Sequence, residues 1–534
     1  MEHSLLHTLQ LLGLLVATAG PLLVLLLARG LLGTLAFQQL PDRWRRTSRN
    51  AALIGAAAVA LDVFVQVAEA DGRTVFGGVE LAQVATFLTT TTVGHLAVLR
   101  VACLLVAALA LVSSTRQAWW LSLLACIGAT GATAWVSHAA AQPTAREFAL
   151  GMQILHLFAV AGWMGVLVHW WMSRDLWLSA DDPTLTQCFA TLLGRFSPWA
   201  LVLVSLLFVS GVAGLVRFVS SLSDLLFSAY GLTLTLKLLL LFPVFWAGYV
   251  NFRFVVPGLQ RANGGAATLV GRFHRTLEIE ITAGVLVIAV AGIVGSVSPP
   301  SEDGGVTLTS SQIAAITSPR FPEARLIDPS TFVGAAERNV FDLKYSEFMH
   351  NWSGVLVMVM GLLWWMQSAG GRSAEWASKA WPFVLLPFAA FISYFADPEV
   401  FVLRQVTFWE AVSDPVVLEH QVGAVLVLVL VWLGWKDSGR PQAQRPLGPA
   451  LPALMIFGSL LLLGHAHSSV RSTQELTNLI NVQHAVFGML GLLAGVIRWF
   501  LLRGLLPARG WRHVWAVLVL LLGAFMAFCY REAV

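Results

Sequence analysis

Residues 51–70 read AALIGAAAVALDVFVQVAEA, a stretch that is apolar except for Asp62, Gln66 and Glu69. Roughly 20 such residues are enough to cross the hydrocarbon core of a bilayer as a helix. The chain is 57% hydrophobic and 12% charged, which is more apolar surface than a soluble domain can bury. We count about fourteen stretches of this kind, near residues 5–36, 51–70, 96–114, 118–141, 148–173, 197–217, 230–250, 277–297, 348–368, 380–396, 418–436, 450–467, 481–502 and 511–529. The sequence therefore predicts an all-α, polytopic bundle of transmembrane helices.

The positive charges predict the orientation of these helices. Lys and Arg gather in cytoplasmic loops, and here they gather in alternate loops, beginning with the loop that holds Arg43, Arg45, Arg46 and Arg49. We expect those loops to face the cytoplasm and both termini to face the outer, periplasmic side of an inner membrane. The net charge of +4 then reflects topology and implies no nucleic-acid partner. The chain also lacks a Gly-rich nucleotide-binding loop, so no nucleotide partner is expected.

The spans divide the chain into two membrane domains. Residues 1–300 hold eight predicted spans, and residues 347–534 hold six. Between them, residues 301–346 are rich in Ser, Pro, Asp and Glu and show little helical or strand periodicity until the next span approaches. We expect this middle segment to be an outer linker or a small lid.

Most of the histidines fall at the ends of spans that are predicted to face outward. They are His138, His156, His350, His420, His465, His467 and His484. Imidazole is the commonest metal ligand in proteins and the usual axial ligand of b-type haem. Histidines gathered on one face of a membrane protein therefore indicate capture of a metal or a haem at that face.

Four stretches of the first half carry a resemblance to a known family: Thr89-Thr90-Thr91-Thr92-Val93-Gly94 running to Arg100, Ser137-His138-Ala139-Ala140-Ala141, His156 to Gly165, and Asn251-Phe252-Arg253 with Arg275 to Glu280. In this order and topology, residues 1–300 resemble the CopD copper-resistance and copper-transport membrane family. The resemblance implies copper as the metal and carries over His138 and His156 as its ligands. Two departures, Ser137 in place of Gly and Val166-Leu167 in place of Gly-Gly, affect packing more than ligands.

The residues around His138 and His156 support a metal site independently of that resemblance. His138 ends the fourth span, and His156 lies about two turns into the fifth on the outer side. Met152 lies four residues before His156 and so shares its helix face. Imidazole with a thioether would suit Cu(I). The alternative is that both histidines are interfacial groups satisfied by backbone or water, with Met152 in ordinary packing.

Ionisable residues within the spans give a second candidate feature. Asp62, Gln66 and Glu69 recur at i, i+4 and i+7, which places them on one stripe of the second span. Lys237 lies at an overlapping depth in the seventh span. Such groups are expensive in hydrocarbon and usually face a protein interior or an aqueous path. They predict either an ion or proton pathway leading inward, or an Asp62–Lys237 pair that locks two helices together.

The second half repeats one pattern at three outer span entrances. His350, His420 and His484 each precede a Gly by three or four residues, and a Trp follows near the inner end. This pattern indicates three helical hairpins, formed by spans nine and ten, eleven and twelve, and thirteen and fourteen. His465 and His467 close the twelfth span on the same side, although i and i+2 point to different faces of a continuous helix.

Three interpretations of this second histidine cluster stay open. In the first, His350, His420, His484 and one of His465 and His467 bind copper at the outer entrance. In the second, His420 and His484 clamp a b-type haem, with Gly423 and Gly488 making room for the macrocycle. In the third, the imidazoles only anchor helix ends.

The first functional hypothesis is a transporter rather than an enzyme, which captures copper at its outer face and moves it into or across the membrane. A rival is a haem-bearing membrane oxidoreductase that reduces Cu(II) before uptake. A third is a copper chaperone or assembly factor that loads another membrane enzyme. The expected partners are the copper ion, membrane lipid and a periplasmic copper chaperone.

Overall fold

The computed structural model describes residues 2–29, 39–72, 74–142, 144–178, 183–261, 266–301, 306–328, 331, 339–438, 440, 448–464 and 473–532. Every regular element in these ranges is a helix, and none is a strand, which confirms the predicted all-α class. Within the same ranges, twelve helices are long and apolar enough to cross a membrane. The two other predicted spans overlap α5 (Arg116–Ala134) and the short apolar helix α21 (Ala450–Gly464). The count of fourteen spans therefore stays a prediction.

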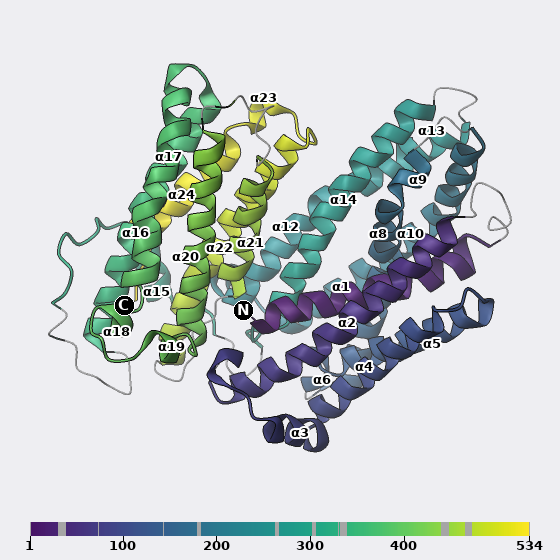
Figure 1. Cartoon of the computed structure of the whole chain (residues 1–534), viewed down its shortest axis with the longest axis horizontal. Helices are drawn as coiled ribbons and strands as arrows, with labels where there is room; N and C mark the ends of the chain where they lie inside the picture. The colour runs from purple at the N-terminus through teal and green to yellow at the C-terminus, as the bar shows by residue number, and fades with distance from the viewer. Residues whose placement is uncertain are drawn as a thin grey trace.

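The first half forms one bundle, seen on the right of Figure 1. Glycines let its first two long helices approach closely, since a Cβ on Gly13 would lie 2.7 Å from the Cα of Gly55. The threonine-rich stretch breaks the chain between two helices, and the Thr91 side chain accepts from the backbone N–H of Gly94 to begin the second of them. The elements are α1 (Glu2–Leu22), η1 (Leu23–Leu27), α2 (Leu40–Ala70), η3 (Val75–Gly77), α3 (Leu81–Thr90), α4 (Thr92–Ala110), α5, α6 (His138–Ala141), α7 (Arg146–Val160), η4 (Ala161–Gly165), α8 (Val166–Met172), α9 (Arg174–Leu178), α10 (Pro183–Phe218), α11 (Leu222–Phe227), α12 (Ala229–Val250), η5 (Asn251–Val255), α13 (Val256–Arg261) and α14 (Ala266–Val294).

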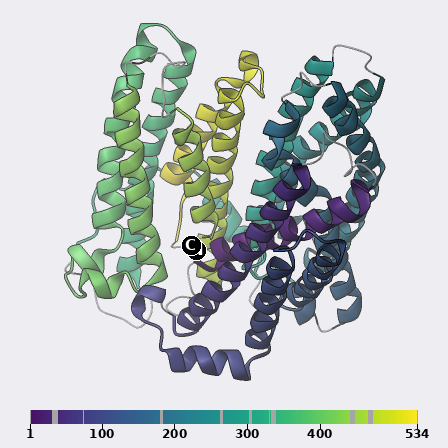
Figure 2. The same cartoon turned by 45° about the vertical axis from the view of Figure 1, so that its right-hand side comes forward.

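The second half forms a separate bundle beside the first (Figure 2). Small residues again set its tightest contacts: a Cβ on Gly354 of α16 would lie 2.4 Å from the backbone N of Ala527 in α24. The two helices of each predicted hairpin pack together, and α16 also packs on α24 and α21 on α22. The elements are α16 (Val340–Ala369), α17 (Arg372–Ala390), η7 (Phe391–Phe395), α18 (Pro398–Phe401), α19 (Phe408–Ala411), α20 (Pro415–Asp437), α21, α22 (Gln474–Leu502), α23 (Ala508–Trp511) and α24 (Val514–Cys529).

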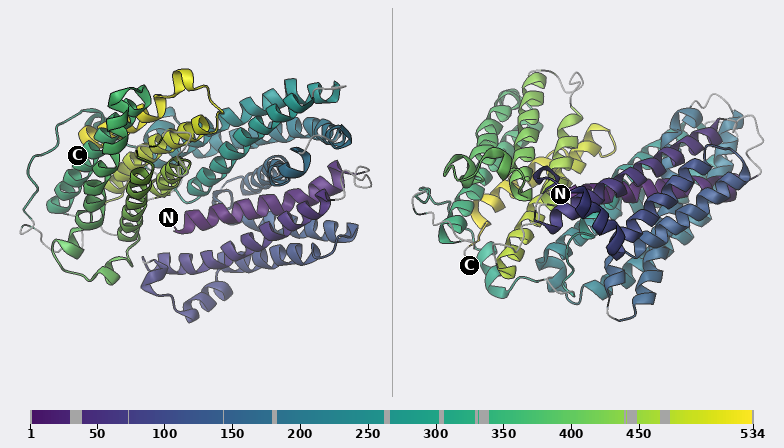
Figure 3. Two further views of the ribbon diagram at one scale, coloured as in Figure 1. Left: turned by 45° about the horizontal axis from the view of Figure 1, so that its top comes forward. Right: turned by 60° about the horizontal axis from the view of Figure 1, so that its bottom comes forward.

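The two bundles meet along α12 and α22, with α14 beside α21. Arg503, just after α22, forms an ion pair with Glu278 of α14 across this contact. The N-terminus lies where the bundles meet, and the C-terminus lies toward the same end of the second bundle (Figures 1 and 3). We call this the outer end, following the orientation that the charges predict.

The segment between the halves is fastened to both of them. The backbone N–H of Leu308 donates to the carbonyl of Phe227 in the first half at 2.9 Å, and that of Arg320 donates to Phe528 in the second half at 2.8 Å. The segment also contains a helix that the sequence pattern did not predict, α15 (Ser310–Thr317). Thr309 caps it and pairs with Gln312 in a reciprocal capping box, which is why so short a helix forms there. We call residues 306–328 the strap.

Candidate metal-binding cavity

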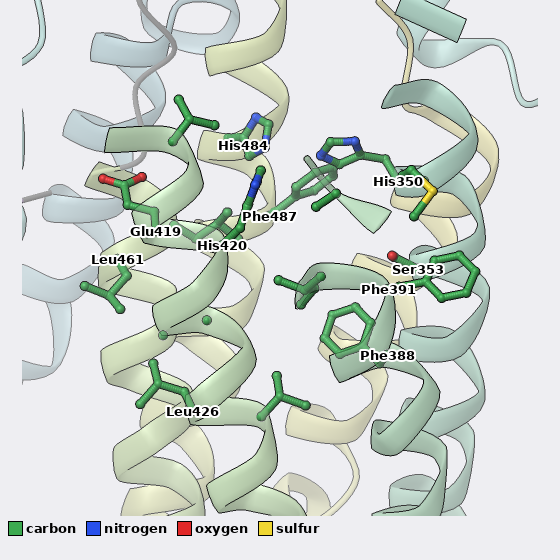
Figure 4. Close-up of a pocket in the computed structure, with 18 of the residues that line it drawn as sticks. His350, Ser353, Phe388, Phe391, Glu419, His420, Leu426, Leu461, His484 and Phe487 are labelled. Atoms are coloured by element: carbon green, nitrogen blue, oxygen red, sulfur yellow. The ribbon is translucent and has the colours of Figure 1, made fainter. Parts of the chain in front are cut away.

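The second bundle encloses a cavity of about 690 Å³, lined by residues of α16, α17, η7, α20, α21, α22 and α24 (Figure 4). Its depth is apolar and partly aromatic, with Phe388, Phe391 and Leu426 on the walls. Its polar residues come mainly from the outer ends of the helices and from the connections there. The cavity therefore has a polar mouth and an apolar interior.

His350, His420 and His484 all line this cavity and gather in one region of it (Figure 4). His350 lies ten residues after Val340, where α16 begins, and His484 lies ten residues after Gln474, where α22 begins. The equal offset brings these two imidazoles to one level, with ring centroids 5.4 Å apart and planes at 85°. The structure thus brings together three histidines that the sequence placed at three separate helix entrances.

Hydrogen bonds fix which nitrogen of each imidazole faces a ligand. Nδ1 of His350 lies 2.9 Å from the carbonyl of Ser346, and Nδ1 of His484 lies 2.9 Å from the carbonyl of Ile480. Nδ1 of His420 lies 3.0 and 3.1 Å from the two carboxylate oxygens of Asp397. These oxygens can only accept, so Nδ1 carries the proton and Nε2 carries the lone pair of each neutral ring. Metal-binding histidines are oriented in this way.

The C-terminal residues hold His350 and His484 from the outer side. Tyr530 stacks on His350 with ring centroids 4.0 Å apart, and its hydroxyl donates to Glu532 at 2.6 Å. The backbone N–H of Arg531 donates to Gln483 Oε1 at 2.8 Å, and Gln483 Nε2 donates back to the Arg531 carbonyl at 2.7 Å. Because Gln483 precedes His484, this exchange positions α22 at the level of the imidazoles.

The remaining donor atoms of the cavity are soft sulfurs and hard carboxylates. Four methionines line it: Met349, Met360, Met455 and Met526. Its acidic residues are Asp342, Asp397, Glu410, Asp414 and Glu419. Thioether and imidazole ligands together favour Cu(I), whereas carboxylates attract any cation. In the part of the chain that the structure describes, no three His, Cys, Asp or Glu side chains are arranged to hold a metal ion. A site here would therefore use imidazole pairs and thioethers rather than a preformed cluster of those four residue types.

Two imidazoles that bind one ion each place a nitrogen about 2.0–2.1 Å from it. With the ring radii added, a linear arrangement separates the centroids by roughly 6 Å. The ring centroids of His350 and His484 lie within that separation, at 5.4 Å.

The predicted haem pair, His420 and His484, lines this cavity together. His420 Nδ1 contacts Asp397, and His484 is in ring contact with His350. Gly423 lines the cavity, but Gly488 does not make room for a macrocycle, because a Cβ there would lie 2.4 Å from Cγ of Leu463 in α21. The prediction that Gly488 makes room for a haem was therefore wrong, because the missing side chain of Gly488 lets α22 pack closely on α21. His465 and His467 lie outside the described residues.

Sequence reasoning missed Asp397 and Tyr530. Asp397 lies in the connection after η7, and an acidic residue followed by Pro398 at an outer span end was its only signal. Tyr530 lies in a tail without periodicity, so nothing in the sequence placed it on His350.

In the first half, both predicted histidines face α10 but at different depths. The His138 ring packs edge-on against Phe218, with centroids 6.2 Å apart. His156 Nδ1 lies 2.9 Å from Ser210 Oγ, whose hydroxyl donates to the Leu206 carbonyl at 2.6 Å, so His156 donates to the hydroxyl oxygen. Ser210 and Phe218 are eight residues apart, or about 12 Å along the helix. Met152 is half-buried one turn before His156.

The polar stripe of α2 is present, with a partner that was not predicted. Gln66 Nε2 donates to Asp62 Oδ2 at 2.8 Å, which confirms the i, i+4 contact. The Asp62 carboxylate, only 2% exposed, pairs with His3 Nδ1 at 2.8 Å. The predicted Asp62–Lys237 pair is therefore wrong, because the first helix reaches Asp62 before α12 can. Glu69 is exposed at the outer end of the stripe.

Fold and cavity together define a polytopic helical membrane protein with imidazole and thioether groups near its outer end. Residues 4–148 match the family model for the copper resistance protein D-like N-terminal domain, and residues 190–294 match that for copper resistance protein D. The resemblance of the first half to the CopD family is thereby confirmed. Neither match reaches the second half.

Two curated relatives agree with these matches. The chain is 29% identical over 188 residues to the copper transport protein CutJ of Bacillus subtilis (strain 168), which covers 34% of this chain and 31% of that protein. It is 30% identical over 179 residues to copper resistance protein D of Pseudomonas syringae pv. tomato, which covers 32% of this chain and 56% of that protein. The matched part is thus about a third of one relative and about half of the other. No solved structure matches the chain significantly.

Proposed function

We propose that the protein captures copper at its outer end and moves it into or across the inner membrane. The observation that carries this proposal is the set of three imidazoles around one cavity, each with Nδ1 beside an oxygen acceptor, which leaves the lone pair of the neutral ring on Nε2. The CopD-family matches and the names of both relatives support copper as the cargo.

The donor atoms favour copper over the commoner hard cations. Mg²⁺ and Ca²⁺ take oxygen ligands, whereas His350 and His484 offer nitrogen, and the thioether of Met526 lines the same cavity. The carboxylates at the mouth attract a hydrated cation, and the imidazoles and sulfurs then retain an ion that accepts soft ligands. Carboxylates that attract the ion and softer ligands that retain it are what a capture site needs.

The cavity lies next to the polar stripe of the first half. The backbone N–H of Thr74, just beyond α2, donates to the Ser413 carbonyl at 2.8 Å, and its hydroxyl donates to the Val412 carbonyl at 3.2 Å. These bonds hold the outer end of α2 against the connection that leads into α20, which carries Glu419 and His420. An ion released from the cavity would meet Glu69, Gln66 and Asp62 in that order.

The test is copper uptake by cells and Cu(I) binding by the purified full-length protein, measured by competition with a coloured chelator. Replacing His350 and His484 together with Ala should abolish tight binding and lower uptake. His95→Ala is the matched control, because His95 is exposed and its Nε2 contacts the Thr89 carbonyl outside the cavity. Normal Cu(I) binding and normal copper uptake by the double variant, when it inserts normally into the membrane, would rule the proposal out. Normal binding without any uptake in the wild type would instead favour the chaperone or assembly-factor hypothesis.

A second candidate is a b-type haem site in the same cavity, which would make the second half an electron-transfer domain. The observation that favours it is volume: about 690 Å³ with mostly apolar walls is far more room than one metal ion needs. The residues fit a haem in having imidazoles beside an apolar space, with His420 and His484 as the predicted axial ligands. An absorption spectrum of the oxidised and dithionite-reduced protein decides, because a Soret band with a sharpened reduced α-band requires haem and a featureless visible spectrum excludes it.

A further inference from the structure

The first bundle buries a carboxyl group in its core. Glu280 is the middle residue of α14, fourteen residues from Ala266 and fourteen from Val294, and it is 2% exposed. Its hydrogen-bond partner is an amide, with Asn251 Nδ2 donating to Oε2 at 2.9 Å. The two ends of the fourth CopD-like stretch, far apart in sequence, thus meet inside the membrane domain.

No charge compensates this carboxyl group. The elements that pack on α14 carry the titratable groups Glu2, His3 and His7 of α1, His169 of α8, Arg174 and Asp175 of α9, Tyr230, Lys237 and Tyr249 of α12, Arg253 of η5 and Arg261 of α13. Within the described residues, none of them forms an ion pair or hydrogen bond with Glu280. Glu278, two residues away, is paired with Arg503 instead. A carboxylate buried without a cation is costly, so the occluded group holds a proton.

The surroundings of Glu280 are nevertheless built to tolerate its ionised form. Thr276 donates its hydroxyl to Asn251 Oδ1 at 2.5 Å, which turns the amide N–H toward Glu280. Asn251 begins the π-helical turn η5, a local widening that is frequent at functional sites. Gly248 leaves room for the carboxyl, since a Cβ there would lie 3.2 Å from Oε1. An oriented donor beside a neutral acid stabilises the anion once the proton leaves.

A soft donor lies one helical turn away on the same face of α14. Gly284 follows Glu280 by four residues, and a Cβ on Gly284 would lie 2.5 Å from the sulfur of Met164. Met164 belongs to the second π-helical turn of this bundle, η4, eight residues after His156. At 1.5 Å per residue, His156 and Met164 are about 12 Å apart along their helix. The α10 residues that contact His138 and His156, namely Phe218 and Ser210, are separated by the same distance.

We propose that Glu280 and Met164 form an exchange site where a proton is traded for Cu(I) near the inner end of the first bundle. This inference rests on the proposed function and adds its coupling ion. As Cu(I) reaches the thioether of Met164, the proton leaves the Glu280 hydroxyl for water, and the carboxylate left behind balances the charge of the ion. When the ion departs, a proton returns to the carboxylate. One positive charge enters for each that leaves, so the core of the bundle stays neutral throughout.

Proton occupancy is tested first, without transport, by infrared spectroscopy of the full-length protein in lipid nanodiscs. Glu280→Gln should remove a protonated-carboxyl band that is present in the wild type at neutral pH, and Glu278→Gln should leave it. Asn251→Leu should shift the same band, because the amide no longer donates to the carboxyl. If no band disappears in the Glu280→Gln protein, the inference is overturned.

Coupling is tested in proteoliposomes that contain a pH-sensitive dye, with Cu(I) supplied on one side. Copper movement through the wild type should drive protons the opposite way, and Glu280→Gln should lose this proton movement while Glu278→Gln retains it. Copper movement without protons in the wild type would sink the exchange site but leave the proposed transport standing. A wild type that moves no copper would sink the proposed transport, and the infrared result would still report the proton on Glu280.

Discussion

Replacing Asp397 with Asn tests whether the cavity binds copper through oriented imidazoles. Asp397 holds His420 Nδ1 with both carboxylate oxygens, at 3.0 and 3.1 Å. Loss of a carboxylate that orients a ligating histidine typically lowers metal affinity by about 10–100-fold, which corresponds to about 1.4–2.8 kcal/mol of binding free energy. Asn can still accept from Nδ1, so we expect the lower end of this range for Asp397→Asn and the upper end for Asp397→Ala.

The assay is Cu(I) competition with a chelator, and Glu410→Gln is the control. Hydrogen bonds from the backbone N–H and the hydroxyl of Thr407 hold the pKa of Glu410 below its ordinary value, so it is ionised at neutral pH. Its replacement therefore removes one negative charge from the same cavity without touching His420. If both variants weaken binding equally, the effect is long-range attraction alone and the orienting role of Asp397 is refuted.

Three further outcomes follow from the structure. His138→Ala and His156→Ala should each lower copper uptake with normal membrane insertion, and unchanged uptake in both would show that these imidazoles only pack against α10. Gly523→Ala should destabilise the second bundle by about 1–3 kcal/mol in thermal unfolding through overpacking, because its Cβ would lie 2.3 Å from the backbone N of Met358; Gly423→Ala, with no atom within 4 Å, should be neutral. Partial burial of Asp224 opposes its ionisation, but hydrogen bonds from Thr307, Ser220 and Ser221 outweigh it and hold its pKa below the ordinary 3.8. Because the folded-state pKa is the lower one, this contact stabilises the strap above about pH 3.8, and the stabilisation is lost as the pH falls through the folded value. Limited proteolysis should therefore cut the strap of the Asp224→Asn variant faster than that of the wild type at neutral pH. The two rates should become equal at a pH where Asp224 is protonated.

Helices and histidine placement were readable from the sequence because both follow short-range rules. Twenty apolar residues specify a span wherever they occur, and His350 and His484 share a level because each lies ten residues into its helix. The contacts that complete the site do not follow such rules. Asp397 and Tyr530 reach the imidazoles from a connection and a tail, where no periodicity fixes side-chain direction. An Asp62–Lys237 pair was one of two alternatives that rested on depth alone, whereas helix packing brings His3 to Asp62.

The order of the donor groups argues for inward movement rather than storage. Carboxylates, imidazoles and thioethers line the cavity, and the adjoining first bundle offers Asp62 on α2 and, on another helix, His156 followed eight residues further inward by Met164. An ion moving along these groups still needs its charge balanced near the inner end, and Glu280, which pairs with no cation among the described residues, is the group that we propose supplies this balance.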